Sequence, residues 1–139
     1  MIAYISEVSC EKTIHDDVQN IISTAKKHNK LNNITGALFY SDGFFLQIIE
    51  GDKDQLKSLM ANIEKDPRHS NVEYLLDTEI ESRSYQAWSM DSLQVKSGNV
   101  FNAETMRRLT DDFTHNFMPR TDMLIHYYKT FLEEKKYLA

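Results

Sequence analysis

One polar residue stands inside an otherwise apolar stretch and is the first candidate for chemistry. Gln47 lies in the segment FFLQIIE, among hydrophobic neighbours on both sides. Burying an amide costs a few kcal/mol unless its hydrogen bonds are made, so Gln47 needs a partner. Tyr4, in the apolar segment IAYIS, has the same need for its hydroxyl group. A neighbouring strand, a water molecule or a ligand would each satisfy these groups.

Tyr4 and Gln47 could also be each other's partners. A glutamine amide both donates and accepts hydrogen bonds, and it can flip. A Tyr4–Gln47 pair that faces a heteroaromatic ligand therefore forms a relay with two hydrogen-bonded states. Without a ligand, the same pair is an ordinary hydrogen bond inside the core.

Other kinds of chemistry find little support in the sequence. There is no GxGxxG and no GxxxxGK[ST] pattern, so neither a dinucleotide-binding turn nor a phosphate loop is expected. The histidines show no paired ligand spacing, and we expect no metal site. They stand at positions 15, 28, 69, 115 and 126. Cys10 is the single cysteine; it cannot form an internal disulfide, and a packing role is favoured over a nucleophilic one.

The composition indicates one soluble domain of ordinary size. The chain has 139 residues, of which 41% are hydrophobic. Its 16 Lys and Arg against 21 Asp and Glu give a net charge of −5, which argues against a nucleic-acid partner. No segment approaches the ~20 apolar residues of a membrane span, and the N-terminus lacks the pattern of a secretion signal. These features predict a cytoplasmic protein without a membrane partner.

The first half of the chain predicts three strands and a helix. Residues 2–6, 34–41 and 44–50 are rich in β-branched and aromatic side chains, which is typical of strands. Asp42-Gly43 between the last two predicts a tight hairpin. Thr13 begins a capping pattern, and the apolar residues after it recur at helical spacing to about Asn29.

The second half predicts a helix, two strands and two further helices. A helix follows the capping residue Asp52 and ends at Asp66-Pro67, and strands follow at 72–76 and 87–95. The order is β-α-β-β-α-β plus one more strand. This predicts a ferredoxin-like α+β fold, with a mixed five-stranded sheet and two helices on one face. We expect the two C-terminal helices to cover the other face or to pair with a second copy.

Several short motifs occur along the chain in a specific order, and the combination is more informative than any one of them. They are Tyr4-Ile5-Ser6, Lys27-His28-Asn29, Asn33-Ile34-Thr35-Gly36, Phe45 to Gly51 (FLQIIEG), Asp66-Pro67-Arg68-His69 and Trp88-Ser89-Met90. With this element order, the chain resembles the BLUF domains, blue-light sensors that use FAD, in their short stand-alone form. The resemblance covers roughly residues 2 to 95.

The resemblance implies a flavin-binding photosensor domain at residues 1–96 and a helical output or capping extension at residues 97–139. The isoalloxazine ring of FAD would insert between the two helices that pack on the sheet. Tyr4 would donate an electron and a proton on illumination, and Gln47 would contact both Tyr4 and the flavin. Asn29 would bind the polar edge of the ring, and His28 would flank it.

Further cofactor and signalling residues follow from the same resemblance. Arg68 would reach the carbonyl edge or a phosphate of the cofactor. The remaining cofactor-binding candidates are Ser6, Lys27, Asp66 and His69, with Lys26 and Lys30 as further charges for the diphosphate. Trp88 and Met90 would carry the signal at the output strand. Tyr85, Ala25 and Asn62 depart from residues that many or some relatives carry, namely Phe, Ser and Arg.

Simpler structural readings of these residues remain open. Asn29 also suits a helix C-terminus, and the neighbouring lysines complement the helix dipole there. Arg68 and His69 would serve equally as a solvated loop pair, and Trp88 as a core residue.

The implied function is that of a blue-light photoreceptor without enzymatic activity. Light would rearrange the hydrogen bonds of Gln47, and the last strand and the C-terminal helices would pass the signal to a partner protein or to a homo-oligomer. Two other classes stay open. One is a ferredoxin-like flavin-dependent enzyme with His28 as its acid or base, and the other is a cofactor-free interaction module.

Overall fold

The computed structural model describes residues 1–8, 14–41, 43–85, 91–96 and 100–138. Strands and two helices make up the first part of the described chain, and two further helices end it. In chain order the elements are β1 (Ile2–Val8), α1 (Ile14–Leu31), β2 (Thr35–Tyr40), β3 (Phe44–Glu50), α2 (Lys53–Lys65), β4 (His69–Asp77), β5 (Asp91–Gln94), α3 (Ala103–Asn116) and α4 (Thr121–Glu134).

The strands form one five-stranded sheet in the order β4-β1-β3-β2-β5. The pairs β4-β1, β1-β3 and β3-β2 are antiparallel, and β5 runs parallel to β2. β2 and β3 are the two arms of the predicted hairpin, while α1 and α2 provide the two crossovers. The structure thus confirms the predicted ferredoxin-like α+β fold with an additional strand and a mixed sheet.

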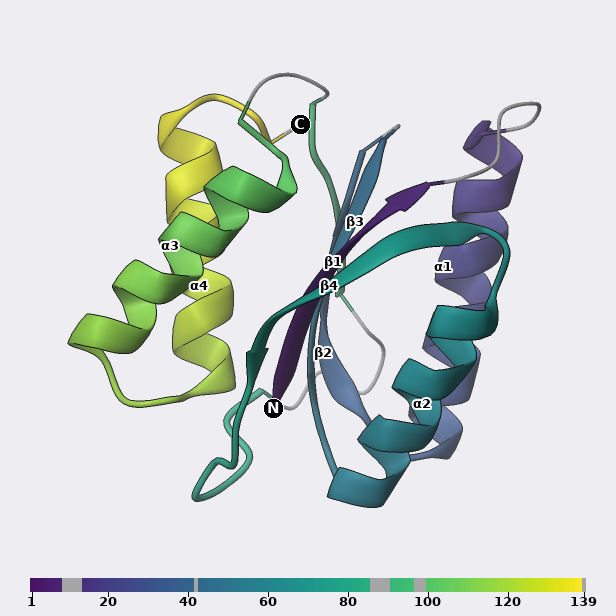
Figure 1. The fold of residues 1–139 in the computed structure, drawn as a ribbon, viewed down its shortest axis with the longest axis horizontal. Coiled ribbons are helices and arrows are strands. Elements are labelled where there is room, and N and C mark those ends of the chain that lie inside the picture. The colour runs from purple at the N-terminus through teal and green to yellow at the C-terminus, as the bar shows by residue number, and fades with distance from the viewer. Residues whose placement is uncertain (9–13, 42, 86–90, 97–99, 139) are drawn as a thin grey trace.

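Each face of the sheet carries its own hydrophobic core, because side chains alternate between the faces along a strand. α1 and α2 cover one face, and α3 and α4 cover the other (Figure 1). The strand residues that face α1 and α2 are Ile2, Tyr4, Leu38, Phe45 and Ile49. The strand residues on the opposite face are Ala3, Ile5, Ala37, Phe39, Leu46 and Ile48.

The C-terminal helices pack on the sheet of their own chain, which is one of the two arrangements expected from the sequence. Tyr128 of α4 is fully buried and meets the Phe39 ring edge-on, with ring centroids 6.2 Å apart. Arg107 of α3 donates to the Glu73 carboxylate of β4 from Nε at 2.9 Å. None of the helices in the described ranges is long and apolar enough to cross a membrane.

Most of the predicted strands have different bounds in the structure, and the differences are largest for β4 and β5. β4 begins at His69 instead of residue 72, since the polar residues His69 and Ser70 pair with Val8 and Glu7 of β1. These residues lack the apolar pattern on which the prediction depended. β5 includes residues 91–94, and the predicted part at 87–90 lies outside the described residues.

Gly36 of β2 lies directly against the backbone of the neighbouring strand β3. A Cβ atom at this position would stand 1.9 Å from the carbonyl oxygen of Ile48, and the φ angle of Gly36 is 156°. Both the close contact and the backbone angle exclude larger residues. The glycine therefore lets β2 pair with the strand that carries Gln47.

Replacing Gly36 with alanine should destabilise the protein by about 2–4 kcal/mol, because the added carbon forces the two central strands apart. Urea unfolding followed by circular dichroism measures the loss. Gly43→Ala is the matched control, since a Cβ there meets nothing within 4 Å, and it should change stability by less than about 0.5 kcal/mol. Equal stability of the two variants would contradict this role for Gly36.

Candidate functional site

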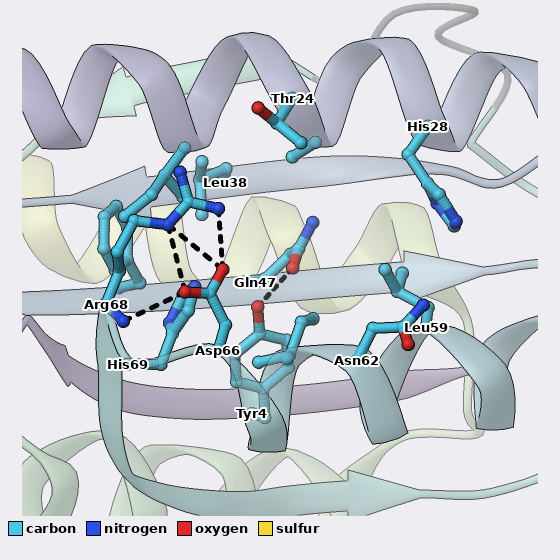
Figure 2. A pocket seen from close by; sticks show the side chains of 14 residues that line it. Tyr4, Thr24, His28, Leu38, Gln47, Leu59, Asn62, Asp66, Arg68 and His69 are labelled. Atoms are coloured by element: carbon cyan, nitrogen blue, oxygen red, sulfur yellow. Dashed lines mark hydrogen bonds and ion pairs between the residues drawn. The ribbon is translucent and has the colours of Figure 1, made fainter.

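A cavity of about 200 Å³ lies between α1, α2 and the sheet (Figure 2). Helix α1 lines one side, α2 and the turn after it line the other, and strands form the floor. The lining residues are Ile21, Thr24, Ala25 and His28 of α1; Leu59, Asn62, Ile63 and Asp66 of α2 and its C-cap; Tyr4, Leu38, Phe45 and Gln47 of the strands; and Arg68 and His69.

The two helices present matching stripes to the cavity. On α1 the stripe begins at Ile21 and on α2 at Leu59, and each continues at i+3, i+4 and i+7. Residues at this spacing share one face of a helix. Thr24, Leu59 and Ile63 were not predicted as site residues, although this spacing is visible in the sequence. The missing information was which helix faces would meet.

Tyr4 and Gln47 are direct neighbours on the central strands β1 and β3. The Tyr4 hydroxyl donates a hydrogen bond to Oε1 of Gln47 (Figure 2). Both side chains are buried, with 1% and 3% of their surface exposed. Burial raises the pKa of the Tyr4 phenol far above its usual range. The phenol is therefore neutral, as a hydrogen-bond donor must be.

Polar atoms without partners lie at the C-terminal end of α1. Asn29 is 1% exposed, and within the described residues neither Oδ1 nor Nδ2 of its side chain has a hydrogen-bond partner. Nδ1 of His28, a cavity residue, is also buried and unpaired there. Each such group costs about 1–3 kcal/mol unless something satisfies it. This end of α1 is thus equipped to bind a ligand with both donors and acceptors.

Arg68 and Asp66 form an ion pair at the other end of the cavity (Figure 2). The guanidinium donates from Nη2 at 2.6 Å and from Nε at 3.0 and 3.1 Å to the carboxylate oxygens. The hydrogen bonds from Arg68 lower the pKa of Asp66. The pair is partly exposed, which leaves the arginine at the cavity edge and fixed in direction.

His69 lines the cavity next to this ion pair. Its Nδ1 atom lies 2.9 Å from Oγ of the buried Ser6, and its ring packs at 5.2 Å between centroids on Phe45. Burial lowers the pKa of His69 below the usual value for a histidine, against the opposing effect of Asp66. The imidazole is therefore neutral at neutral pH.

The predicted site residues fall into three groups. Tyr4, Gln47, His28, Asp66, Arg68 and His69 line the cavity together. Ser6 and Asn29 are buried beside lining residues, whereas Lys27 is exposed and not part of the lining. Trp88 and Met90 lie outside the described residues.

Over the described ranges, no three His, Cys, Asp or Glu side chains gather as a metal site would require.

A sequence model of a known family matches most of this region. The match covers residues 1–91, and the family is described as sensors of blue-light using FAD. The chain belongs to the BLUF family. The matched range contains every residue that lines the cavity.

Known BLUF proteins resemble the chain in sequence and in fold. A photoactivated adenylate cyclase subunit beta of Euglena longa is 31% identical over 123 residues, which are 88% of this chain and 12% of that protein. The structure of BlsA in its ground state is similar with a TM-score of 0.65 at 26% identity, over 94% of this chain and 85% of that one. BlrB in its dark state gives 0.60 at 28% identity, over 82% and 80%.

Part of the pH dependence of the protein's stability should come from His69, which is neutral in the folded protein. Folding lowers the pKa of this histidine. Below about pH 6.5 the unfolded chain therefore binds a proton that the folded protein does not, and the free energy of unfolding decreases as the pH falls. Urea midpoints between about pH 7.5 and 5.5 should fall less in His69→Gln than in the unchanged protein. His126→Gln, on the exposed side of α4, is the control and should keep the full dependence. The same slope in His69→Gln as in the parent would contradict this assignment.

Proposed function

We propose that this BLUF protein is a blue-light photoreceptor that binds FAD non-covalently in the cavity between α1 and α2. The observation that carries the proposal is a set of buried atoms of His28 and the adjacent Asn29 that no described residue satisfies, beside the cavity that contains the Tyr4–Gln47 pair. The polar edge of an isoalloxazine ring alternates carbonyl acceptors with an N–H donor. The amide of Asn29 offers the complementary donor and acceptor.

The remaining cavity residues support this fit. Arg68, held by Asp66, is placed to bind the carbonyl edge or a phosphate of the cofactor. Ser6 holds His69 through the contact at 2.9 Å. Lys27 acts near the diphosphate, outside the cavity, as do Lys26 and Lys30. These positive charges lie at the end of α1, where they are free to approach a phosphate at the protein surface.

In the proposed cycle Tyr4 and Gln47 do the chemistry of the protein. Bound FAD supplies the absorption of blue light and, once excited, the acceptor of one electron. Tyr4 would give that electron, and its phenolic proton would pass along its hydrogen bond to Oε1 of Gln47; Tyr4 would then regain both, so no net oxidation would remain. Gln47 would be left rotated or as its tautomer, placed to hydrogen-bond a carbonyl group of the flavin. The reaction needs no substrate, and we propose that the chain is not an enzyme.

Tyr4→Phe and Gln47→Leu should each leave flavin bound and abolish the light-induced shift of its absorption. Spectra of the purified, flavin-loaded protein before and after blue light measure this, and the unchanged protein should show a small red shift that decays in the dark. Tyr127→Phe, on the opposite face of the sheet, is the control and should keep the shift. A normal shift in Tyr4→Phe or Gln47→Leu would refute the relay, and a protein that takes up no flavin would refute the site.

A chain of hydrogen bonds links β3 to the C-terminal helices and supports an output on that side. Glu50, fully buried at the end of β3, accepts from the backbone N–H of Tyr85 at 2.7 Å and of Ser84 at 3.2 Å. Ser84 Oγ in turn accepts from the backbone N–H of Asp122 in the first turn of α4, at 3.1 Å. A shift of β3 at Gln47 therefore acts on α4 through Glu50 and Ser84.

We propose that residues 1–96 sense light and that the extension at residues 97–139 passes the signal on. Trp88 and Met90 complete the route along the last strand. The output is contact with a downstream protein, a change of homo-oligomer, or both, in the cytoplasm. Two or three rearranged hydrogen bonds at about 0.5–1.5 kcal/mol each supply less than the ~5.5 kcal/mol that a complete switch requires. Light thus shifts a population of states partially.

Hydrogen exchange of backbone amides should detect this route. In the flavin-loaded protein, exchange in the first turn of α4 should differ between dark and light, and Ser84→Ala should raise the dark exchange rate about five-fold and reduce the difference. The absorption shift should stay unchanged in this variant. Ser82→Ala, at an exposed position of the same segment, is the control. Identical exchange in dark and light in the unchanged protein would count against the route.

A further inference from the structure

Asn32 contacts His28 twice, from the position directly after the last residue of α1. Its Nδ2 atom donates to the backbone carbonyl of His28 at 2.8 Å. The same Nδ2 atom lies 3.3 Å from Nε2 of the His28 ring. The backbone N–H of Asn32 also donates to this carbonyl, at 3.1 Å. The side-chain amide is therefore held against the imidazole by the backbone at the end of the helix.

These contacts decide which ring nitrogen of His28 carries the proton. A carbonyl oxygen only accepts hydrogen bonds, so the atom of Asn32 that faces it is the nitrogen and not the oxygen of the amide. An amide nitrogen only donates, so Nε2 of His28 must accept and must be without a proton. The neutral ring then carries its hydrogen on Nδ1.

Nδ1 is the atom of His28 that is buried and has no partner among the described residues. His28 also lines the cavity between α1 and α2. We propose that Asn32 is a positioning residue that fixes His28 as the Nδ1–H tautomer, so that His28 offers a hydrogen-bond donor to an acceptor atom of the flavin. This inference rests on the proposed function and adds a residue outside the cavity lining to the recognition of the cofactor.

The arrangement makes the cavity selective for an acceptor at this point. With Nε2 engaged by Asn32, the ring cannot turn its unprotonated nitrogen toward the ligand without losing that hydrogen bond. Asn29, the next residue, offers both a donor and an acceptor. A carbonyl oxygen or an unprotonated ring nitrogen of the cofactor matches the fixed donor of His28, whereas an N–H group does not.

Nitrogen NMR of the histidine-labelled full chain tests the inference, first without added flavin and then with FAD. His28 should show a protonated Nδ1 and an unprotonated Nε2 in both samples. Asn32→Asp replaces the donor with an acceptor, so it should move the proton to Nε2 or leave both nitrogens protonated. It should also weaken FAD binding about three- to ten-fold. Asn20→Asp, the same change at an exposed position of α1, is the control and should alter neither measurement.

The outcomes separate this inference from the function on which it rests. A protonated Nε2 in the unchanged protein, or an unchanged tautomer in Asn32→Asp, would overturn the role of Asn32. A changed tautomer with unchanged FAD affinity would overturn the contact between His28 and the flavin. If the protein bound no FAD while His28 carried its proton on Nδ1, the proposed function would fail and the tautomer assignment would stand.

Discussion

The cost of enclosing polar atoms in an apolar layer governs the organisation of this protein. The central strands bury Tyr4 and Gln47 between the sheet and two helices, and the strand register places them directly opposite each other. Their mutual hydrogen bond satisfies the hydroxyl group of Tyr4 and the amide oxygen of Gln47. Asn29, buried at the end of α1, has no such solution within the described chain. The pairing inside the sheet, and the helix-end atoms that no described residue satisfies, are the features on which the proposed ligand site rests.

Strand β3 connects the two halves of the molecule because it is central in the sheet and buried on both faces. Gln47 points toward the cavity between α1 and α2, and Glu50, an odd number of residues later, serves the opposite face. The Glu50 carboxylate is fully buried, and backbone N–H groups satisfy it. Breaking these hydrogen bonds would leave buried acceptor oxygens unsatisfied, which costs free energy. We propose that a displacement of β3 at one face is carried to the other face through these hydrogen bonds.

Local sequence signals predicted the fold well because most of them act over a few residues. The Asp42-Gly43 hairpin signal, the Asp52 cap and the alternation within residues 44–50 each require only neighbours along the chain. The start of β4 was wrong because the polar residues His69 and Ser70 become strand only by pairing with β1. For the same reason the sequence could name Tyr4 and Gln47 as unusual but could not show that Asn32 reaches the ring of His28. That contact depends on where the helix ends.

The charge state of the cavity restricts what the proposed relay can leave behind. The Tyr4 phenol and the His69 imidazole are both neutral at neutral pH, and the Arg68 guanidinium is already paired with Asp66. Among the described lining residues, only the Asp66 carboxylate carries a charge that would favour a cation on Tyr4, and it is already paired with Arg68. Separated charges interact strongly in an apolar interior, and an oxidised phenol that kept its proton would be a buried cation. We therefore expect the proton to follow the electron and to return with it, so that the proposed relay leaves only a neutral rearrangement of the Gln47 hydrogen bonds.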